Sequence, residues 1–369
     1  MRILFIYRSS RKEIYRLVTT GQASDSPLYG LNHLEELGAS TSFFDEDKEL
    51  GGFVKWIDQF SRKVIIATEL GWNIGQAIQS LKRLRNYDLI FATTDSTGLP
   101  LAFLKRLGMF PTPLVIASQG LCQFLSIKGW NWAFRLHRWS LKSVDHIMHY
   151  GYAEGEQLCR SFGLASDKVS WIPIGIDTRY FSPLPVIELD DVVLSVGRDR
   201  CRDYALLMEV ARCLPLRFRV ITTPGCLSGI SVPPNVEVFF DLPIEEVRRH
   251  YAACRFVVLP IKPSSYSFGT TVVLECLNMG KAVIVSKTDA VGEREGGYQL
   301  VDGVHCRFIP PGDAGKLCNA IQELWARTDL CNEFGRHGRL LVEDLYNSRA
   351  FAKRLSNLFT QVISKCSVG

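Results

Sequence analysis

The chain has 369 residues, with 43 Lys and Arg against 38 Asp and Glu and a formal net charge of +5. Its composition, 47% hydrophobic and 22% charged, is typical of folded globular proteins and argues against disordered, collagen-like and coiled-coil chains. The length exceeds what one hydrophobic core usually serves, so we expect two domains.

The charge and cysteine patterns narrow the class of protein further. The weak positive charge comes without a recognised nucleic-acid-binding module, so we expect no nucleic acid partner. No run approaches the roughly 18 apolar residues of a membrane-spanning helix, and the first residues do not resemble a secretory signal. The 11 cysteines form no C-x-x-C pair, and the 7 histidines show no metal-ligand spacing. We therefore expect reduced thiols, a cytoplasmic location and no metal.

Short apolar runs recur along the chain, and amphipathic stretches such as Tyr204–Cys213 and Ile244–Ala253 separate them. Continuous apolar runs are typical of strands that are covered on both faces. The strands predicted in the first half are Ile3–Tyr7, Val64–Thr68, Asp88–Thr93, Pro113–Ser118 and His146–Tyr150. Those predicted in the second half are Val192–Val196, Phe218–Thr222, Val236–Phe240, Phe256–Pro260 and Ala282–Ser286. Strands that alternate with helices predict the α/β class, with parallel sheets covered by helices on both sides.

Residues 121–146 combine Trp130, Trp132 and Trp139 with several Arg and Lys residues. Tryptophan beside cations is typical of a surface that touches anionic lipid or a lipid-linked acceptor, here at the inner face of a membrane. A helix that packs on the core and carries a solvated basic edge fits the same pattern. The sequence leaves both interpretations open.

Residues 173–185 contain three prolines, which remove backbone donors and restrict their neighbours. We therefore place the domain boundary here. The prediction is an N-terminal Rossmann-like domain over 1–175, a linker over 176–190, a C-terminal Rossmann-like domain over 191–347 and a final helix over 348–369. Within the last segment, Ser348–Lys365 has apolar residues at helical spacing and should pack on one of the domains.

Three arginines, Arg198, Arg200 and Arg202, follow Gly197 just after the first predicted strand of the second half. Open parallel sheets bind ligands at the carboxyl ends of their strands, and guanidinium groups match the oxygens of a diphosphate. The alternative is a solvated charge cluster, in which the arginines pair with the neighbouring aspartates 199 and 203.

Gly269, Thr270 and Thr271 precede an apolar run that ends at Gly280, which predicts a helix with its start near residue 270. The first N–H groups of a helix lack internal partners, and together with the helix dipole they bind phosphate. An ordinary buried helix that needs only a cap is the alternative interpretation.

Glu275 lies in this predicted helix among apolar residues, so we expect it to be buried and to have hydrogen-bond donors. A ribose diol would supply two hydroxyl donors. A neighbouring Arg or Lys, or loop amides, would satisfy the carboxylate equally well.

In order and spacing, these segments together resemble glycosyltransferase family 4. The resemblance covers roughly residues 140 to 345 and is weak before residue 140. The motifs that carry it are Ile172–Asp177 with Phe181, Val193–Arg198, Arg202, Phe256–Pro260, Ser267–Glu275, Gly280–Ile284 and Ile309–Asp313. The resemblance implies a GT-B fold, in which two Rossmann-like domains face each other across a cleft. It also implies a retaining glycosyltransferase that moves a sugar from a nucleotide diphosphate donor to a hydroxyl acceptor.

The resemblance also assigns roles to residues. Glu275 would bind the ribose, and Arg198 and Arg202 would bind the diphosphate as candidate catalytic residues. The remaining donor-binding candidates are Ser267, Phe268, Gly269, Thr270 and Thr271. The donor would lie on the C-terminal domain and the acceptor against the N-terminal domain. No metal or other cofactor is expected if the arginines neutralise the diphosphate.

Three positions depart from the family pattern. The family usually has two glutamates separated by seven residues, and Ser267 stands at the first of them. Its basic pair is usually Arg then Lys, where this chain has two arginines. The segment Asp88–Pro100 lacks the family's histidine, and Asp95 and Thr94 are its polar replacements, so Asp95 is a third candidate catalytic residue. These departures leave two alternatives open: a non-catalytic GT-B protein that uses the cleft or the Trp/Arg segment for binding, and a sugar-nucleotide epimerase.

Overall fold

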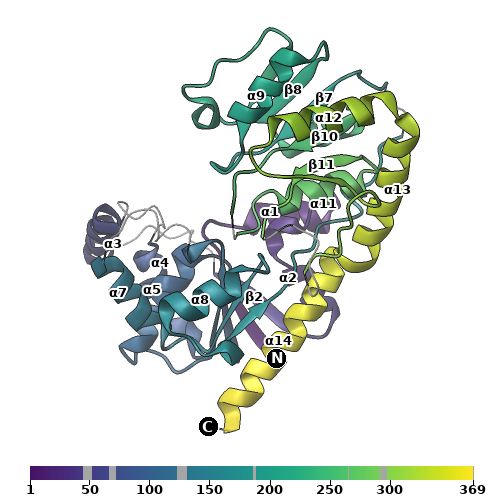
Figure 1. Ribbon diagram of the computed structural model, residues 1–369. Helices are drawn as coiled ribbons and strands as arrows, with labels where there is room; N and C mark the ends of the chain where they lie inside the picture. Colours follow the sequence, from purple (N-terminus) through teal and green to yellow (C-terminus); the bar gives the residue numbers. More distant parts are fainter. Residues whose placement is uncertain are drawn as a thin grey trace. The chain divides into compact units, whose positions relative to one another are not determined.

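The computed structural model describes residues 1–44, 52–65, 72–122, 131–185, 188–264, 266–289, 291 and 297–368. The chain divides into two compact units (Figure 1). The first unit contains Met1–Pro173 together with Ser348–Gly369, and the second contains Ile174–Asn347. The chain therefore passes from the first unit to the second near Pro173 and returns at Ser348.

The first unit is built on a six-stranded parallel sheet in the order β2-β1-β3-β4-β5-β6. Its strands are β1 (Arg2–Ile6), β2 (Ser40–Phe44), β3 (Leu89–Ala92), β4 (Leu114–Ser118), β5 (His146–His149) and β6 (Val169–Trp171). Its helices are α1 (Lys12–Thr19), α2 (Leu31–Glu36), α3 (Gly52–Ile65), α4 (Ile74–Leu84), α5 (Asp95–Arg106), α7 (Asn131–Leu141), α8 (Glu154–Phe162) and α14 (Ser348–Val368). The predicted C-terminal helix is confirmed, and α14 packs against α2 of this unit.

The second unit has a six-stranded parallel sheet in the order β12-β11-β10-β7-β8-β9. Its strands are β7 (Val193–Val196), β8 (Phe218–Thr222), β9 (Val236–Phe240), β10 (Phe256–Leu259), β11 (Val283–Ser286) and β12 (Arg307–Ile309). Its helices are α9 (Tyr204–Cys213), α10 (Ile244–Ala253), α11 (Thr270–Asn278), α12 (Ala314–Ala326) and α13 (Thr328–Leu345). The predicted α/β class with two parallel sheets is confirmed.

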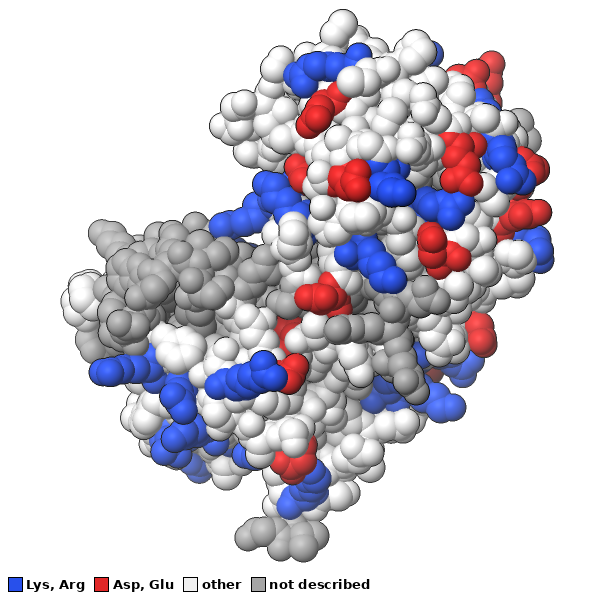
Figure 2. Space-filling view, viewed as in Figure 1, with Lys and Arg blue, Asp and Glu red and all other residues white. Residues whose placement is uncertain are grey.

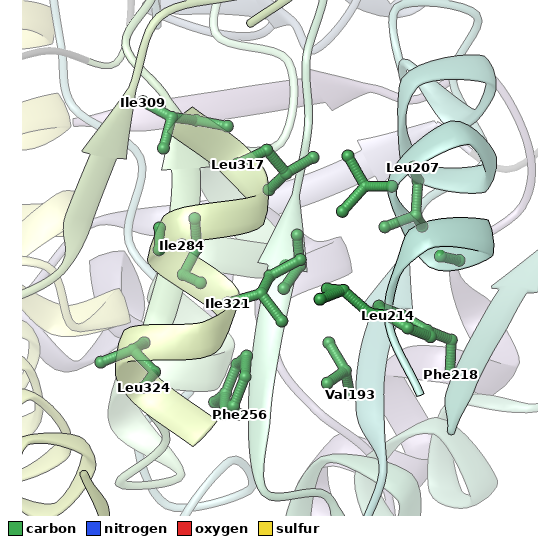
Figure 3. Close-up of a cluster of buried hydrophobic side chains, with 14 of the residues drawn as sticks. Val193, Leu207, Leu214, Phe218, Phe256, Ile284, Ile309, Leu317, Ile321 and Leu324 are labelled. Carbon is green, nitrogen blue, oxygen red and sulfur yellow. The ribbon is translucent and has the colours of Figure 1, made fainter. Parts of the chain in front are cut away.

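The central strands of each sheet are mostly apolar and are buried along their whole length. Residues of β3, β4, β7, β10 and β11 are buried without alternation, as parallel strands between helices require. In the second unit, one apolar cluster joins α9 and α12 to the sheet beneath them, with Leu207, Leu317 and Ile321 meeting Val193 and Phe256 (Figure 3). This packing holds the carboxyl ends of the strands at one edge, where ligands bind in such folds.

Two differences from the sequence prediction have physical causes. The predicted strand Val64–Thr68 is wrong at its start, because Val64 and Ile65 belong to α3, and residues 66–68 lie outside the described residues. A short apolar run at the end of an amphipathic helix looks the same as a buried strand. The strands β2, β6 and β12 were not predicted. All three lie at sheet edges, where one side of the strand is unpaired and the apolar run is short or interrupted.

Candidate active site

A pocket of about 750 Å³ lies in the second unit at the carboxyl edge of its sheet. The order of the strands reverses between β7 and β10, and open α/β sheets bind ligands at such a switch point. Loops after β7 and β9 and the first turns of α11 form the wall of the pocket. Its polar lining includes Arg198, Asp199, Arg202, Asp241, Tyr251 and Glu275.

Arg202 is a buried cation in this wall, with a side chain that is only 2% exposed. Its Nε lies 3.2 Å from Oδ2 of Asp199. Within the described part of the chain, however, neither Nε nor Nη1 has a hydrogen-bond partner. A guanidinium group stays charged, and a buried charge is stable only when its donors are satisfied. Donors of this kind could bind an anion in the pocket.

Two glycines allow the guanidinium group to lie against the backbone. A Cβ atom at Gly197 would overlap Nε of Arg202. A Cβ atom at Gly269 would overlap Nη1 of Arg202 and lie 2.7 Å from Cδ1 of Ile261. Gly269 also has φ of +83°, a conformation that favours glycine. Both positions thus require glycine for a packing reason, and Gly269 for a backbone reason as well.

Arg198 lies at the exposed rim of the pocket, and its Nη2 donates to the carbonyl oxygen of Leu242 at 2.7 Å. Asp203 caps α9 by accepting a hydrogen bond from the N–H group of Leu206 at 3.2 Å. The alternative of a charge cluster therefore holds for Arg202, whose side chain contacts Asp199. The guanidinium group of Arg198 is held by a carbonyl group instead.

Glu275 is buried in the wall of the pocket, 7% exposed, and the hydroxyl group of Tyr251 donates to its Oε2 at 3.1 Å. Burial raises the pKa of Glu275 to about 8, although the hydrogen bond from Tyr251 and the charge of Arg202 act in the opposite direction. The hydrogen-bond donor that we expected for the Glu275 carboxyl group is therefore the hydroxyl group of the buried Tyr251, which no sequence pattern indicated. One hydroxyl group leaves the carboxyl group with capacity to accept further hydrogen bonds from a ligand.

The first turn of α11 faces the same pocket through Thr271. Gly269 is the N-cap residue, and Thr270 is buried with an Oγ1 atom that has no partner among the described residues. Ser267 and Phe268 lie just before this turn, partly buried, and do not line the pocket. The ring of Phe268 packs edge-on against Tyr266, with 4.7 Å between the ring centroids.

Five of the nine candidate site residues therefore line one pocket. They are Arg198, Arg202, Gly269, Thr271 and Glu275. The other four do not line it. They are Ser267, Phe268, Thr270 and Asp95.

Asp95 belongs to the first unit, where it is buried in the first turn of α5. Its Oδ2 accepts a hydrogen bond from the N–H group of Gln119 at 2.7 Å. Burial raises the pKa of Asp95 to about 7, although the hydrogen bond from Gln119 acts against this. A second buried acid, Glu154, lies near it and was not predicted. The only sequence signal for Glu154 is its position just after the predicted strand His146–Tyr150.

The remaining predictions concern metals and membranes. Within the ranges that the structure describes, no three His, Cys, Asp or Glu side chains come together as metal ligands, and no helix has the length and hydropathy needed to span a bilayer. Of the Trp-containing segment 121–146, residues 123–130 lie outside the described residues, as does the side chain of Trp132. Trp139 is described and is 39% exposed.

Two family models match the chain. The model described as Glycosyltransferase Family 4 matches residues 33–180, and the model described as Glycosyl transferases group 1 matches residues 215–327. Together they extend over both units. The O-antigen chain mannosyltransferase C of Escherichia coli is 27% identical over 119 residues, which are 32% of this chain. The match spans 30% of that relative's length.

Solved structures of glycosyltransferases have the same fold over nearly the whole chain. The sucrose-phosphate synthase of Thermosynechococcus elongatus superposes with a TM-score of 0.71 at 18% identity, covering 99% of this chain and 100% of that one. Anabaena Alr3699/HepE, solved in complex with UDP, gives a TM-score of 0.67 at 15% identity over 98% of this chain and 100% of its own. At these identities the likeness shows the fold, which is that of the GT-B glycosyltransferases.

Proposed function

Because the chain belongs to the glycosyltransferases whose family models it matches, we propose that it transfers a sugar from a nucleotide diphosphate donor to a hydroxyl acceptor. The observation that carries the proposal is the set of unsatisfied guanidinium donors on Arg202, held between Gly197 and Gly269 in the pocket that Glu275 shares. The structure of HepE was solved with UDP-glucose as well as with UDP. This supports a nucleotide sugar as the donor.

In the proposed complex, Arg202 and Arg198 bind the diphosphate and the first turn of α11 contributes its free N–H groups. Negative charge accumulates on the nucleotide diphosphate as its bond to the sugar breaks. Fixed cations at that position stabilise the transition state. The two arginines supply positive charge that a divalent cation supplies in other enzymes, so we expect no metal cofactor.

The carboxylate of Glu275 would accept hydrogen bonds from the two ribose hydroxyl groups of the donor. With a pKa of about 8, this carboxyl group is mostly protonated at pH 7 in the free protein. A ribose diol favours the ionised form, because both hydroxyl groups donate. Donor binding should therefore release a proton, and Tyr251 would remain as the third donor to the same group.

The acceptor is proposed to be a hydroxyl group bound on the first unit, and the surface of that unit suggests where the acceptor comes from. No Asp or Glu occurs between Asp95 and Asp145, whereas six Lys and Arg do. Arg135, Arg138 and Trp139 on α7 and Lys142 just after it are exposed at the i, i+3, i+4, i+7 spacing of one helix face. Figure 2 shows Lys and Arg side chains gathered at the lower left, where Figure 1 places α7.

Exposed apolar side chains lie beside the cations of this α7 surface. Arg106 lies over the ring of Trp139 at 5.4 Å, and Leu107 and Met109, which follow directly, are 55% and 43% exposed. Cations beside exposed aromatic and aliphatic side chains bind anionic lipid headgroups. We therefore propose peripheral attachment to an anionic membrane and an acceptor presented there. The sequence contains no C-x-x-C pair, and we propose that this attachment is on a reducing, cytoplasmic side.

The test is turnover of a panel of uridine, guanosine and adenosine diphosphate sugars, with Arg202→Met and Glu275→Gln as variants. Arg212→Met is the matched control, since Arg212 is an exposed arginine of the same unit, outside the pocket. We expect both pocket variants to lose at least about thirtyfold in kcat/KM and the control to keep its rate. Full activity in both pocket variants would contradict the site, and nucleotide binding without turnover of any donor would favour the non-catalytic alternative. The anomeric configuration of the product, read by NMR, tests the proposed retention.

A further inference from the structure

The pocket of the second unit extends beyond the groups assigned to the diphosphate and the ribose. Ile244, Val247 and Tyr251 of α10 line it at the i, i+3, i+7 spacing of one helix face. The hydroxyl group of Tyr251 donates to Glu275, so this end of the helix face lies at the proposed ribose position. Ile244 lies two turns earlier, roughly 10 Å away along the helix axis. The pocket therefore continues past the ribose position into a part where the base of a nucleotide can lie.

The helix and strand that line this part of the pocket contribute apolar side chains. Ile221 of β8 and Val247 are buried in its wall, and Ile244 is 40% exposed. The flat face of a nucleotide base buries apolar surface against such side chains. Every base has such a face, so this contact does not distinguish one base from another.

The loop between β9 and α10 adds an acidic residue to this apolar part. Asp241 follows β9 directly and lines the pocket together with Leu242 and Pro243. The N–H group of Asp241 donates to the carbonyl oxygen of Thr222 at 3.0 Å, and the carbonyl oxygen of Leu242 accepts from Arg198 at 2.7 Å. Asp241 has φ of +53°, which Asp and Asn adopt more readily than other non-glycine residues. Two hydrogen bonds therefore fix this loop beside the pocket.

The carboxylate of Asp241 is exposed and has no partner in the described part of the chain. The other aspartate of the pocket, Asp199, contacts the guanidinium group of Arg202 at 3.2 Å. A negative charge without a cation repels a diphosphate, unless the ligand brings hydrogen-bond donors to it. The ribose hydroxyl groups are assigned to Glu275. The remaining donors of a nucleotide are the N–H groups of its base.

The common bases differ in the donors that they offer to a carboxylate. Guanine carries N1–H and the N2 amino group side by side, so the two can donate to the two oxygens of one carboxylate. In uracil, N3–H lies between two carbonyl oxygens, which a carboxylate repels. The amino groups of adenine and cytosine lie beside an unprotonated ring nitrogen, so each base offers one donor only. A carboxylate at this position therefore favours guanine.

We propose that the donor is a guanosine diphosphate sugar and that Asp241 selects it, by accepting hydrogen bonds from N1–H and the N2 amino group of guanine. The inference rests on the proposed function, which leaves the base open, and it concerns the second unit alone. UDP keeps the contacts to the diphosphate and the ribose, so it binds in the same pocket more weakly. Asp241 determines specificity and takes no part in the chemical step.

Calorimetric titration with guanosine, inosine and uridine diphosphate (GDP, IDP and UDP) tests the proposal. IDP is the matched probe, because its base keeps N1–H of guanine and lacks the N2 amino group. We expect the wild type to bind GDP at least about tenfold more tightly than UDP, with IDP between them. Asp241→Asn should lose at least about fivefold in affinity for GDP and bind UDP at least as tightly as the wild type. Asp344→Asn, at an exposed position of α13 outside the pocket, is the control and should bind as the wild type does.

A second variant separates the carboxylate from the conformation of the loop. Asp241→Gly adopts a positive φ without a side chain, so it should show the same change of preference as Asp241→Asn. Equal or tighter binding of UDP by the wild type overturns the proposal, as does an equal loss of affinity for all three nucleotides in both Asp241 variants. IDP that binds as tightly as GDP overturns the contact with the N2 amino group. No binding of any of the three nucleotides would instead contradict the proposed function itself.

Discussion

The guanidinium group of Arg202 occupies the space that a side chain at Gly269 would need. Gly269 is also the N-cap residue of α11, so the cation and the free N–H groups of that helix lie side by side. Two loops, one after β7 and one after β10, therefore bring together two kinds of group that can bind phosphate. The first prediction follows from this contact.

Gly269→Ala should abolish nucleotide diphosphate binding, because the added methyl group displaces Arg202 and Ile261 in addition to straining a positive φ. Gly229→Ala is the control, since Gly229 has φ of +75° and no atom within 4 Å of the added Cβ. Both variants should lose about 1 kcal/mol of stability from the backbone, and Gly269→Ala more. Calorimetric titration with UDP separates them. Equal binding by the two variants would contradict the proposed position of Arg202.

Donor binding should weaken as the pH falls below about 8, by up to about tenfold per pH unit, because the ionised form of Glu275 binds the ribose. Glu275→Gln should bind more weakly and lose this pH dependence. Tyr251→Phe removes a donor that favours the ionised carboxylate, so the pKa of Glu275 should rise further and the midpoint move to higher pH. The measurement is the dissociation constant of UDP-glucose from pH 6 to 9. A pH-independent constant in the wild type would contradict the role of Glu275.

Stability should depend on pH through the buried acids of the first unit. Asp95 and Glu154 have raised pKa values in the folded protein, so the folded state holds more protons than the unfolded state between about pH 4 and 8. Their contribution to the free energy of unfolding therefore falls as the pH rises through this range. Asp95→Asn/Glu154→Gln should gain stability relative to the wild type on going from pH 5 to pH 9. Denaturant unfolding at the two pH values measures the change, and a constant difference would argue against it.

A second cluster, where α14 packs on the rest of the first unit, should also make stability depend on pH. Oδ1 of Asp25 accepts from the hydroxyl group of Ser348 at 2.6 Å, and its Oδ2 lies 2.8 Å from Nε2 of His33. Burial opposes both shifts, yet the hydrogen bonds lower the pKa of Asp25, and Asp25 with Glu36 raises the pKa of His33. The acid's contribution is lost as the pH falls through its lowered pKa, and the histidine's as the pH rises through its raised pKa.

In His33→Gln, the free energy of unfolding should therefore fall less steeply as the pH rises through the raised pKa of His33. Ser348→Ala should destabilise α14 by about 1 kcal/mol at every pH at which Asp25 is ionised. Amide hydrogen exchange along α14 measures both effects. Unchanged exchange in Ser348→Ala would show that this contact does not anchor the helix.

The α7 surface predicts binding to anionic vesicles. Arg135→Glu/Arg138→Glu should weaken sedimentation with vesicles that contain 30% phosphatidylglycerol by roughly fivefold for each cation lost, and Trp139→Ala should weaken it independently of salt. Arg217→Glu/Arg249→Glu makes the same charge change at exposed positions of the second unit and should leave binding intact. Equal loss in both double variants would indicate a nonspecific effect of net charge. No binding by the wild type at low salt would remove the membrane proposal.

Much of the fold could be predicted because the central strands of both sheets are continuous apolar runs. The edge strands β2, β6 and β12 could not, since a strand paired on one side only is short or part polar. The residues that line the pocket could be named where a motif follows a strand directly, as with Arg198 and Arg202. The partners could not be named, because they depend on tertiary contacts. Tyr251 reaches Glu275 from α10, and Glu154 reaches Gly120 from the helix that follows the neighbouring strand β5.

The most direct test of the account is the affinity of UDP for Arg202→Met compared with Arg212→Met, measured by calorimetry at pH 8. Arg202 supplies buried, charge-assisted donors to a diphosphate, so we predict at least about a thirtyfold loss of affinity, about 2 kcal/mol. The control should bind as the wild type does. Wild-type affinity in Arg202→Met would contradict the claim that this pocket holds the diphosphate of a sugar donor.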